Sequence, residues 1–146
     1  MPRPLGPFRG RNATLPSPPT RLVPGAEITL EANPDDVTPD RLATWRGIGI
    51  NRLSLGVQTF HPRGLHKLTR THTPAGAIQA CVTARAVFPN CNLDLIYGWD
   101  GQTDGDWLRD LQVAIELEMA HLSLYTLTYE TRTPLGRQAR RGVVEI

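Results

Sequence analysis

Apolar and polar residues alternate with a period of two in four short stretches of the chain, which is typical of β-strands with one buried and one polar face. The stretches are residues 27–32, 51–58, 91–97 and 121–128. In the second stretch the alternation reads Leu53, Ser54, Leu55, Gly56, Val57 and Gln58. We expect the apolar side chains to pack under a layer of helices, and the small and polar side chains to line an interior surface.

Segments with apolar residues at helical spacing separate these stretches. Thr38 and Thr73 each precede a proline, which favours a helix that begins at the proline, and acidic residues after Thr103 favour a third helix start. A shorter helix is predicted over residues 62–68. The residues predicted to face the core are Leu42, Trp45 and Ile48 in the first helix, Ala77, Ile78, Cys81, Ala84, Val87 and Phe88 in the helix after Thr73, and Trp107, Leu108, Leu111 and Ile115 in the helix after Thr103.

The elements therefore follow the order strand, helix, strand, two helices, strand, helix, strand. This alternation is typical of parallel strands joined by right-handed helical crossovers, and it predicts an α/β fold. Strands of this kind form either part of a (βα) barrel or an open sheet, and the periodicity favours neither.

The start of the chain differs from the rest. Its first 25 residues hold seven prolines, four arginines and no acidic residue. Because proline at this density interrupts both regular structures, residues 1–25 are predicted to form a disordered or extended arm. Residues 26–136 are predicted to form the folded domain, and residues 137–146 a basic tail.

The composition argues against several classes of function. A formal net charge of +2 over 146 residues gives no support to a nucleic-acid partner, and no apolar run approaches the length that membrane insertion requires, about 20 residues. Two cysteines do not make a disulfide framework, so a cytoplasmic location is expected. The four histidines lack the spacing of a metal site, and no glycine-rich phosphate loop occurs. We therefore assign no catalytic and no metal-ligating residue.

Polar side chains lie at or near the ends of the predicted strands. Glu31 and Gln58 close the first two strands, and Asp94 lies between two leucines of the third. An unpaired carboxylate in a buried strand costs several kcal/mol, so some group must satisfy Asp94. Since parallel sheets bind ligands at the carboxyl ends of their strands, these residues and nearby Arg70 could grip a zwitterionic ligand with ribose hydroxyls. The alternative is an internal salt-bridge network that only stabilises the sheet.

Four phrases of the sequence carry a resemblance to a known family. They are Leu30–Pro34 (LEANP), Asn51–Phe60 (NRLSLGVQTF), Leu68–Thr73 (LTRTHT) and Leu93–Gly98 (LDLIYG). In this order they resemble radical S-adenosylmethionine proteins related to oxygen-independent coproporphyrinogen III oxidase, especially the haem-chaperone-like members. His121–Tyr125 (HLSLY) and Thr133–Leu135 (TPL) extend the resemblance over residues 27–135.

The resemblance implies a fold and a set of site residues. The implied fold is a partial (βα) barrel of about four βα units with parallel strands. Glu31, Gln58, Arg70 and Asp94 match the positions where the family contacts S-adenosylmethionine. In this comparison Arg70 suits the carboxylate of the cofactor and Asp94 suits its ribose hydroxyls. S-adenosylmethionine and haem are the small-molecule partners that the resemblance implies.

The family splits S-adenosylmethionine reductively with a 4Fe–4S cluster held by a Cys-x3-Cys-x2-Cys motif, which this sequence lacks. We therefore expect a fragment of a radical S-adenosylmethionine protein of haem biosynthesis or haem delivery that is inactive alone. Its standing as an oxidoreductase-like enzyme, and the choice between oxidase and chaperone, stay open. The alternatives are a non-enzymatic haem- or nucleoside-binding module and a non-functional truncated product.

Overall fold

A parallel sheet of four strands organises the part of the chain that the computed structural model describes, which is residues 22–128, 136–137 and 141. The strands lie in the order β1-β2-β3-β4 and each pairs in parallel with its neighbour. The bounds are β1 (Thr29–Ala32), β2 (Arg52–Gln58), β3 (Cys91–Tyr97) and β4 (His121–Thr126). The connections hold η1 (Pro34–Asp36), α1 (Pro39–Gly47), α2 (Pro62–Lys67), α3 (Pro74–Val87) and α4 (Asp104–Glu116). The predicted α/β fold and the order of its elements are confirmed.

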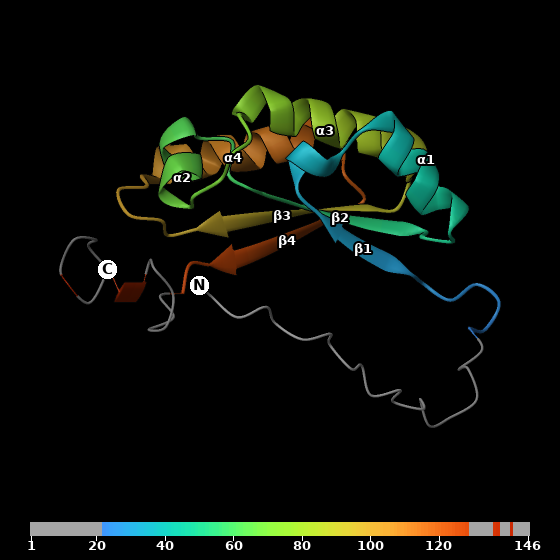
Figure 1. The fold of residues 1–146 in the computed structure, drawn as a ribbon. Helices are drawn as coiled ribbons and strands as arrows, with labels where there is room; N and C mark the ends of the chain where they lie inside the picture. Colours follow the sequence, from blue (N-terminus) through green and yellow to red (C-terminus); the bar gives the residue numbers. More distant parts are fainter. Residues whose placement is uncertain (1–21, 129–135, 138–140, 142–146) are drawn as a thin grey trace, which may run out of the picture.

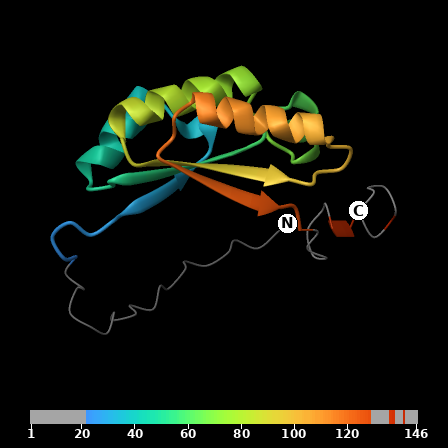
Figure 2. The same cartoon turned by 180° about the vertical axis from the view of Figure 1, so that it is seen from behind.

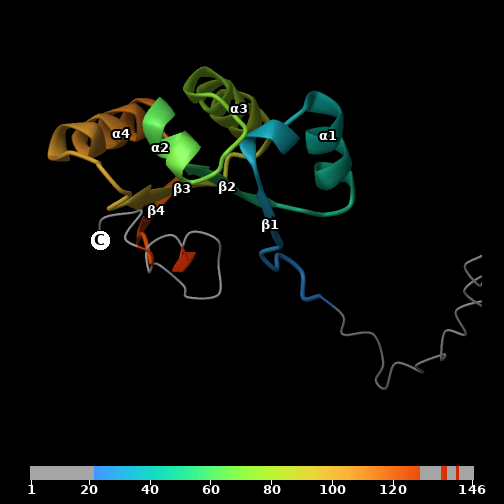
Figure 3. The ribbon, with the colours of Figure 1, turned by 60° about the vertical axis from the view of Figure 1, so that its left-hand side comes forward.

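The helices α1 to α4 lie on one face of the sheet (Figure 1). The view from behind and the view turned by 60° show the same layer of helices on the same side (Figure 2, Figure 3). An open doubly wound sheet carries helices on both faces, whereas a (βα) barrel carries them only outside. Of the two architectures that the periodicity left open, the described residues therefore match the wall of a partial barrel.

The core lies between the sheet and this helical layer. Leu53, Leu55 and Val57 of β2 are fully buried, as are Leu93 and Leu95 of β3. They belong to one apolar cluster with helix residues, among them Leu42, Ala77, Cys81, Ala84 and Phe88. Burying a leucine or valine side chain contributes about 1.5–3 kcal/mol, so this single layer of contacts is the main source of stability.

The predicted helix starts are confirmed by their caps. The hydroxyl of Thr38 accepts a hydrogen bond from the backbone of Arg41, and that of Thr73 accepts one from Gly76. Thr103 and Asp106 form a reciprocal capping box at the start of α4. Each cap satisfies backbone N–H groups that an isolated helix end leaves unpaired.

Four residues predicted to face the core are exposed instead. Ile48 is 72% exposed, Leu108 and Ile115 are each 64% exposed, and Ile78 is 37% exposed. In α4 the fully buried positions are Asp110 and Ala114. The prediction for α4 is confirmed for Trp107 and Leu111, which pack against the core, and wrong for Leu108 and Ile115. It followed the apolar residues alone, whereas the helix turns the carboxylate of Asp110 toward the sheet layer, where buried hydrogen bonds compensate its burial.

The predicted arm, residues 1–25, and the predicted tail, residues 137–146, lie almost entirely outside the described residues. The three-part division of the chain therefore stays a prediction. Within the described ranges, no helix combines the length and the apolar character needed to cross a membrane.

Candidate functional site

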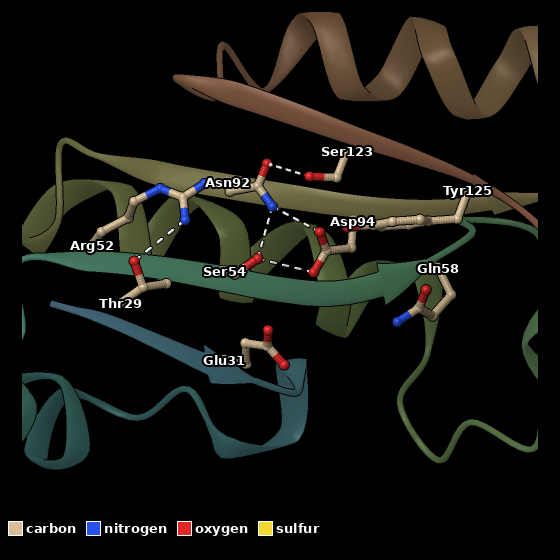
Figure 4. A pocket seen from close by; sticks show the side chains of 9 residues that line it. All are labelled: Thr29, Glu31, Arg52, Ser54, Gln58, Asn92, Asp94, Ser123 and Tyr125. Carbon is tan, nitrogen blue, oxygen red and sulfur yellow. Dashed lines mark hydrogen bonds between the residues drawn. The ribbon is translucent and has the colours of Figure 1, made fainter. Parts of the chain in front are cut away.

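Polar side chains from all four strands line the face of the sheet opposite α1 to α4 (Figure 4). The register explains their common direction, because Glu31 is paired with Ser54 and Asp94 with Ser123, and paired residues point to the same side. They surround a cavity of about 410 Å³. Its lining residues are Thr29, Glu31, Arg52, Ser54, Gln58, Asn92, Asp94, Ser123 and Tyr125.

The four residues predicted to contact a cofactor all line one adjoining cavity, of about 310 Å³. Its walls are Glu31, Ala32, Asn33, Gly56, Gln58, Arg70 and Asp94. Glu31, Gln58 and Asp94 border both cavities. The structure thus brings together side chains from three strands and from the segment after α2, toward the carboxyl ends of β1 and β2.

Asp94 is held by neutral hydrogen-bond donors. Its Oδ2 accepts a hydrogen bond from Ser54 Oγ at 3.0 Å, and its Oδ1 accepts one from Asn92 Nδ2 at 2.7 Å. Among the described residues no salt bridge includes Asp94. The anticipated internal network therefore exists in part, but it is not a salt-bridge network, and each carboxylate oxygen keeps a lone pair for a further donor.

Gln58 adopts a left-handed backbone conformation, with φ of 73°. The pairing of β2 with β3 shifts register between Leu55 and Gln58, which places this residue at an irregularity of the strand. A Cβ atom at Gly56 would come within 2.8 Å of Gln58 Nε2. Gly56 therefore leaves room for the Gln58 amide, which lies across it and faces the cavity.

Arg70 contributes the positive charge of the smaller cavity. Its Nη1 donates a hydrogen bond to Asn33 Oδ1 at 2.9 Å, and burial lowers the pKa of its guanidinium from the usual value. The preceding residue, Thr69, has φ of 55°. Within the described ranges no carboxylate forms a salt bridge with Arg70. Its remaining N–H groups suit a carboxylate or phosphate ligand.

The sequence analysis missed Asp110 of α4. This carboxylate is 1% exposed, and it accepts hydrogen bonds from Thr59 Oγ1 at 2.6 Å and from the backbone N–H of Phe60 at 2.8 Å. Burial raises the pKa of Asp110, although the two hydrogen bonds partly oppose this shift. Asp110 therefore anchors the turn that directly follows Gln58. The available signal was an acidic residue among the apolar positions of an amphipathic helix.

The two cysteines do not suit an iron–sulfur cluster. Cys81 and Cys91 are buried in the core, and burial raises the pKa of their thiols to about 12 and about 11. A cluster ligand is a thiolate, and a radical S-adenosylmethionine cluster needs three of them. The described residues contain no group of three side chains able to hold a metal ion. The residues of this chain therefore do not fit that cluster.

Comparison with models of known protein families identifies the family of this chain. The model of the radical SAM superfamily matches residues 11–114, which is more than half of the chain. The chain belongs to the radical S-adenosylmethionine superfamily.

Within this superfamily, the chain is similar to proteins named heme chaperones. The chain is 43% identical to the heme chaperone HemW of Mycobacterium tuberculosis (strain H37Rv) over 122 residues. This aligned region covers 83% of this chain and 31% of the relative. It is 43% identical over 116 residues to the heme chaperone HemW of Escherichia coli K12, which covers 79% of this chain and 31% of that protein. The chain thus spans about a third of the length of these relatives.

Solved structures support the same fold. Coproporphyrinogen III oxidase (HemN) of Escherichia coli, a radical SAM enzyme, superposes with a TM-score of 0.69 at 29% identity, covering 82% of this chain and 27% of the enzyme. Elp3 of Methanocaldococcus infernus superposes with a TM-score of 0.72 at 18% identity, covering 82% of this chain and 29% of that protein, and this likeness concerns the fold alone.

Proposed function

We propose that this chain binds S-adenosylmethionine through Glu31, Gln58, Arg70 and Asp94, as part of a radical S-adenosylmethionine protein related to the haem chaperones. The observation that carries the proposal is that these residues, from four separate segments, border one cavity of about 310 Å³. Membership in the superfamily supports the choice of ligand.

The chemistry of the cavity matches the charges of this cofactor. Arg70 offers its guanidinium to the cofactor's carboxylate, a pairing that two parallel hydrogen bonds can strengthen. Asp94 accepts hydrogen bonds from the ribose hydroxyls, as acidic residues do in other nucleotide sites. Glu31 supplies a second negative charge, which suits the ammonium group, and Gln58 offers both donors and acceptors.

Cleavage of the cofactor is a separate matter. A 4Fe–4S cluster supplies the electron that splits S-adenosylmethionine in this superfamily, and the residues of this chain do not hold one. We propose that the chain by itself binds the cofactor without cleaving it. Anaerobic reconstitution with iron and sulfide should give neither cluster absorbance nor 5′-deoxyadenosine. Appearance of both would overturn this part of the proposal.

Direct titration tests the binding proposal. Calorimetric titration of the 146-residue chain with S-adenosylmethionine should show saturable binding. Asp94→Asn and Arg70→Ala should each weaken it about tenfold or more, the effect of losing a hydrogen bond to a charged group. Asp104→Asn and Arg109→Ala, which change exposed residues of α4, are the matched controls and should bind like the wild type. Absence of binding, or equal binding by all four variants, would refute the proposal.

Haem is the second candidate ligand. The observation that favours it is 43% identity to two proteins named heme chaperones. Titration of the chain with haem, followed by its Soret absorbance, should give a saturable spectral shift near one equivalent if the described domain carries this function. A linear, unsaturable change would exclude specific haem binding by this chain.

A further inference from the structure

Asn92 is the central residue of a hydrogen-bonded ladder that crosses three strands (Figure 4). It lies on β3 two residues before Asp94, on the same face, and is 2% exposed. Its Nδ2 donates to Asp94 Oδ1 at 2.7 Å and to Ser54 Oγ at 2.7 Å, while its Oδ1 accepts from Ser123 Oγ at 3.1 Å. Every polar atom of this buried amide is therefore used.

The ladder has one direction. Ser123 donates to Asn92, Asn92 donates to Ser54 and Asp94, and Ser54 donates to Asp94 at 3.0 Å. Turning the amide over would place its oxygen 2.7 Å from a carboxylate oxygen, where two acceptors repel each other. The orientation of the Asn92 amide is thus fixed by its neighbours, and all donors converge on Asp94.

We propose that Asn92 is the positioning residue that holds the carboxylate of Asp94 in the orientation that accepts the ribose hydroxyls of the cofactor. This inference rests on the proposed function. The Asn92 and Ser54 bonds occupy one acceptor position on each carboxylate oxygen and leave the others for a ligand. Because both donors are neutral, they fix the carboxylate without cancelling its charge.

The substitution Asn92→Asp tests this role with almost no change in shape. At neutral pH it places a second carboxylate next to Asp94 and removes both N–H donors. We expect the affinity for S-adenosylmethionine to fall about tenfold to a hundredfold at pH 8. Lowering the pH toward 5 should restore part of the affinity relative to the wild type, because a proton shared between the two carboxylates recreates the lost donor.

Other groups on this face titrate or carry charge, and they are the same in wild type and variant. They are Glu31 on β1, Arg52 on β2, His121 and Tyr125 on β4, and Arg70 after α2. The quantity to compare is therefore the ratio of the two affinities at each pH. Asn90→Asp is the matched control, since this exposed residue precedes β3 and borders neither cavity.

A double-mutant cycle separates positioning from general stability. In an Asp94→Asn background, changing Asn92 to Asp should cause little further loss of affinity, because the group that Asn92 positions is already changed. Ser123→Ala, which removes only the outer end of the ladder, should weaken binding less than Asn92→Asp. Thermal unfolding of each variant, with ligand absent, shows whether the fold persists.

The outcomes are distinct. Binding by the wild type together with a pH-independent or additive effect of Asn92→Asp would overturn the positioning role and leave the proposed function intact. Absence of binding by a folded wild-type chain would instead refute the proposed function, and the inference with it. If Asn92→Asp unfolds the chain, the milder Ser123→Ala and Ser54→Ala variants test the positioning role instead. If the ladder positions Asp94, both variants must weaken binding, and unchanged binding by either would overturn the role.

Discussion

The two faces of strand β2 show how one short segment serves two purposes. Leu53, Leu55 and Val57 are 0% exposed and pack under the helices, whereas Ser54 and Gln58 point to the opposite face and line the cavities. Because successive side chains of a strand alternate, the two sets of contacts are nearly independent. Substitutions on the helical side should therefore change the free energy of unfolding, and substitutions on the polar side should change ligand affinity.

The largest expected effect is on the apolar face. Leu93→Ala removes a fully buried side chain of β3 and leaves a cavity between sheet and helices. The free energy of unfolding, measured by urea denaturation, should fall by about 2–5 kcal/mol. Leu108→Ala on α4 is the matched control, because Leu108 is 64% exposed and its loss should cost no more than about 0.5 kcal/mol. Equal costs at both positions would mean that the helical layer is not the source of stability.

Asp110 should affect both stability and ligand affinity, because it lies on the helical side of the sheet and anchors the turn after Gln58. Asp110→Ala leaves the Thr59 hydroxyl and the Phe60 N–H without their buried acceptor. We expect a loss of about 1–3 kcal/mol in unfolding free energy, together with weaker cofactor binding as Gln58 shifts. Asp110→Asn, which keeps one acceptor oxygen, should lose less unfolding free energy and less cofactor affinity than Asp110→Ala. Loss of stability with unchanged affinity would show that the turn does not depend on this anchor.

Gln58 separates the two faces most clearly, because a single substitution there should leave the stability unchanged or raise it while lowering the affinity for the cofactor. Its φ of 73° is strained for a residue with a side chain, so Gln58→Gly relieves strain while removing the amide. Unfolding free energy should stay unchanged or rise by up to about 1 kcal/mol, and cofactor affinity should fall. The same change at Gln79, inside α3, should cost about 1 kcal/mol and leave affinity unchanged. A similar loss of stability at both positions would contradict the strain at Gln58.

Sequence periodicity predicted the strands well because each has a clean two-sided pattern. Asp94 and Gln58 were identified for a physical reason, a polar group in or closing a buried strand, and the structure places them at one cavity with Glu31 and Arg70. The assignment of S-adenosylmethionine, in contrast, came from the family resemblance. Charge and spacing alone allowed any zwitterionic ligand with ribose hydroxyls.

The misses have a common cause. Asp110 and Asn92 were overlooked because their roles depend on distant partners. Thr59 is 51 residues from Asp110 and Ser54 is 38 residues from Asn92, and no local pattern reveals such contacts. The inward placement of Leu108 and Ile115 in α4 was wrong for the same reason, since the burial of Asp110 is favourable only with those distant donors in place. The alternating pattern of a strand gives the side to which a residue points, but not the hydrogen-bond partner that it meets there.

The smallest predicted effect concerns His72, which contacts the backbone at the end of β2. It is 6% exposed, its Nε2 lies 3.1 Å from the Val57 carbonyl oxygen, and burial lowers its pKa below the usual 6.5. As the pH falls below 6.5, His72 therefore takes up a proton in the unfolded chain before it does so in the folded chain. The free energy of unfolding decreases as the pH falls below 6.5.

His72→Gln keeps a donor for the Val57 carbonyl and removes the titration. The unfolding free energy of the wild type should drop more between about pH 7.5 and pH 5.5 than that of His72→Gln, a range chosen to stay above the usual pKa of carboxylates. His66→Gln, at an exposed histidine of α2, should keep the wild-type slope. An identical slope for His72→Gln and the wild type would mean that His72 titrates alike in the folded and unfolded chains.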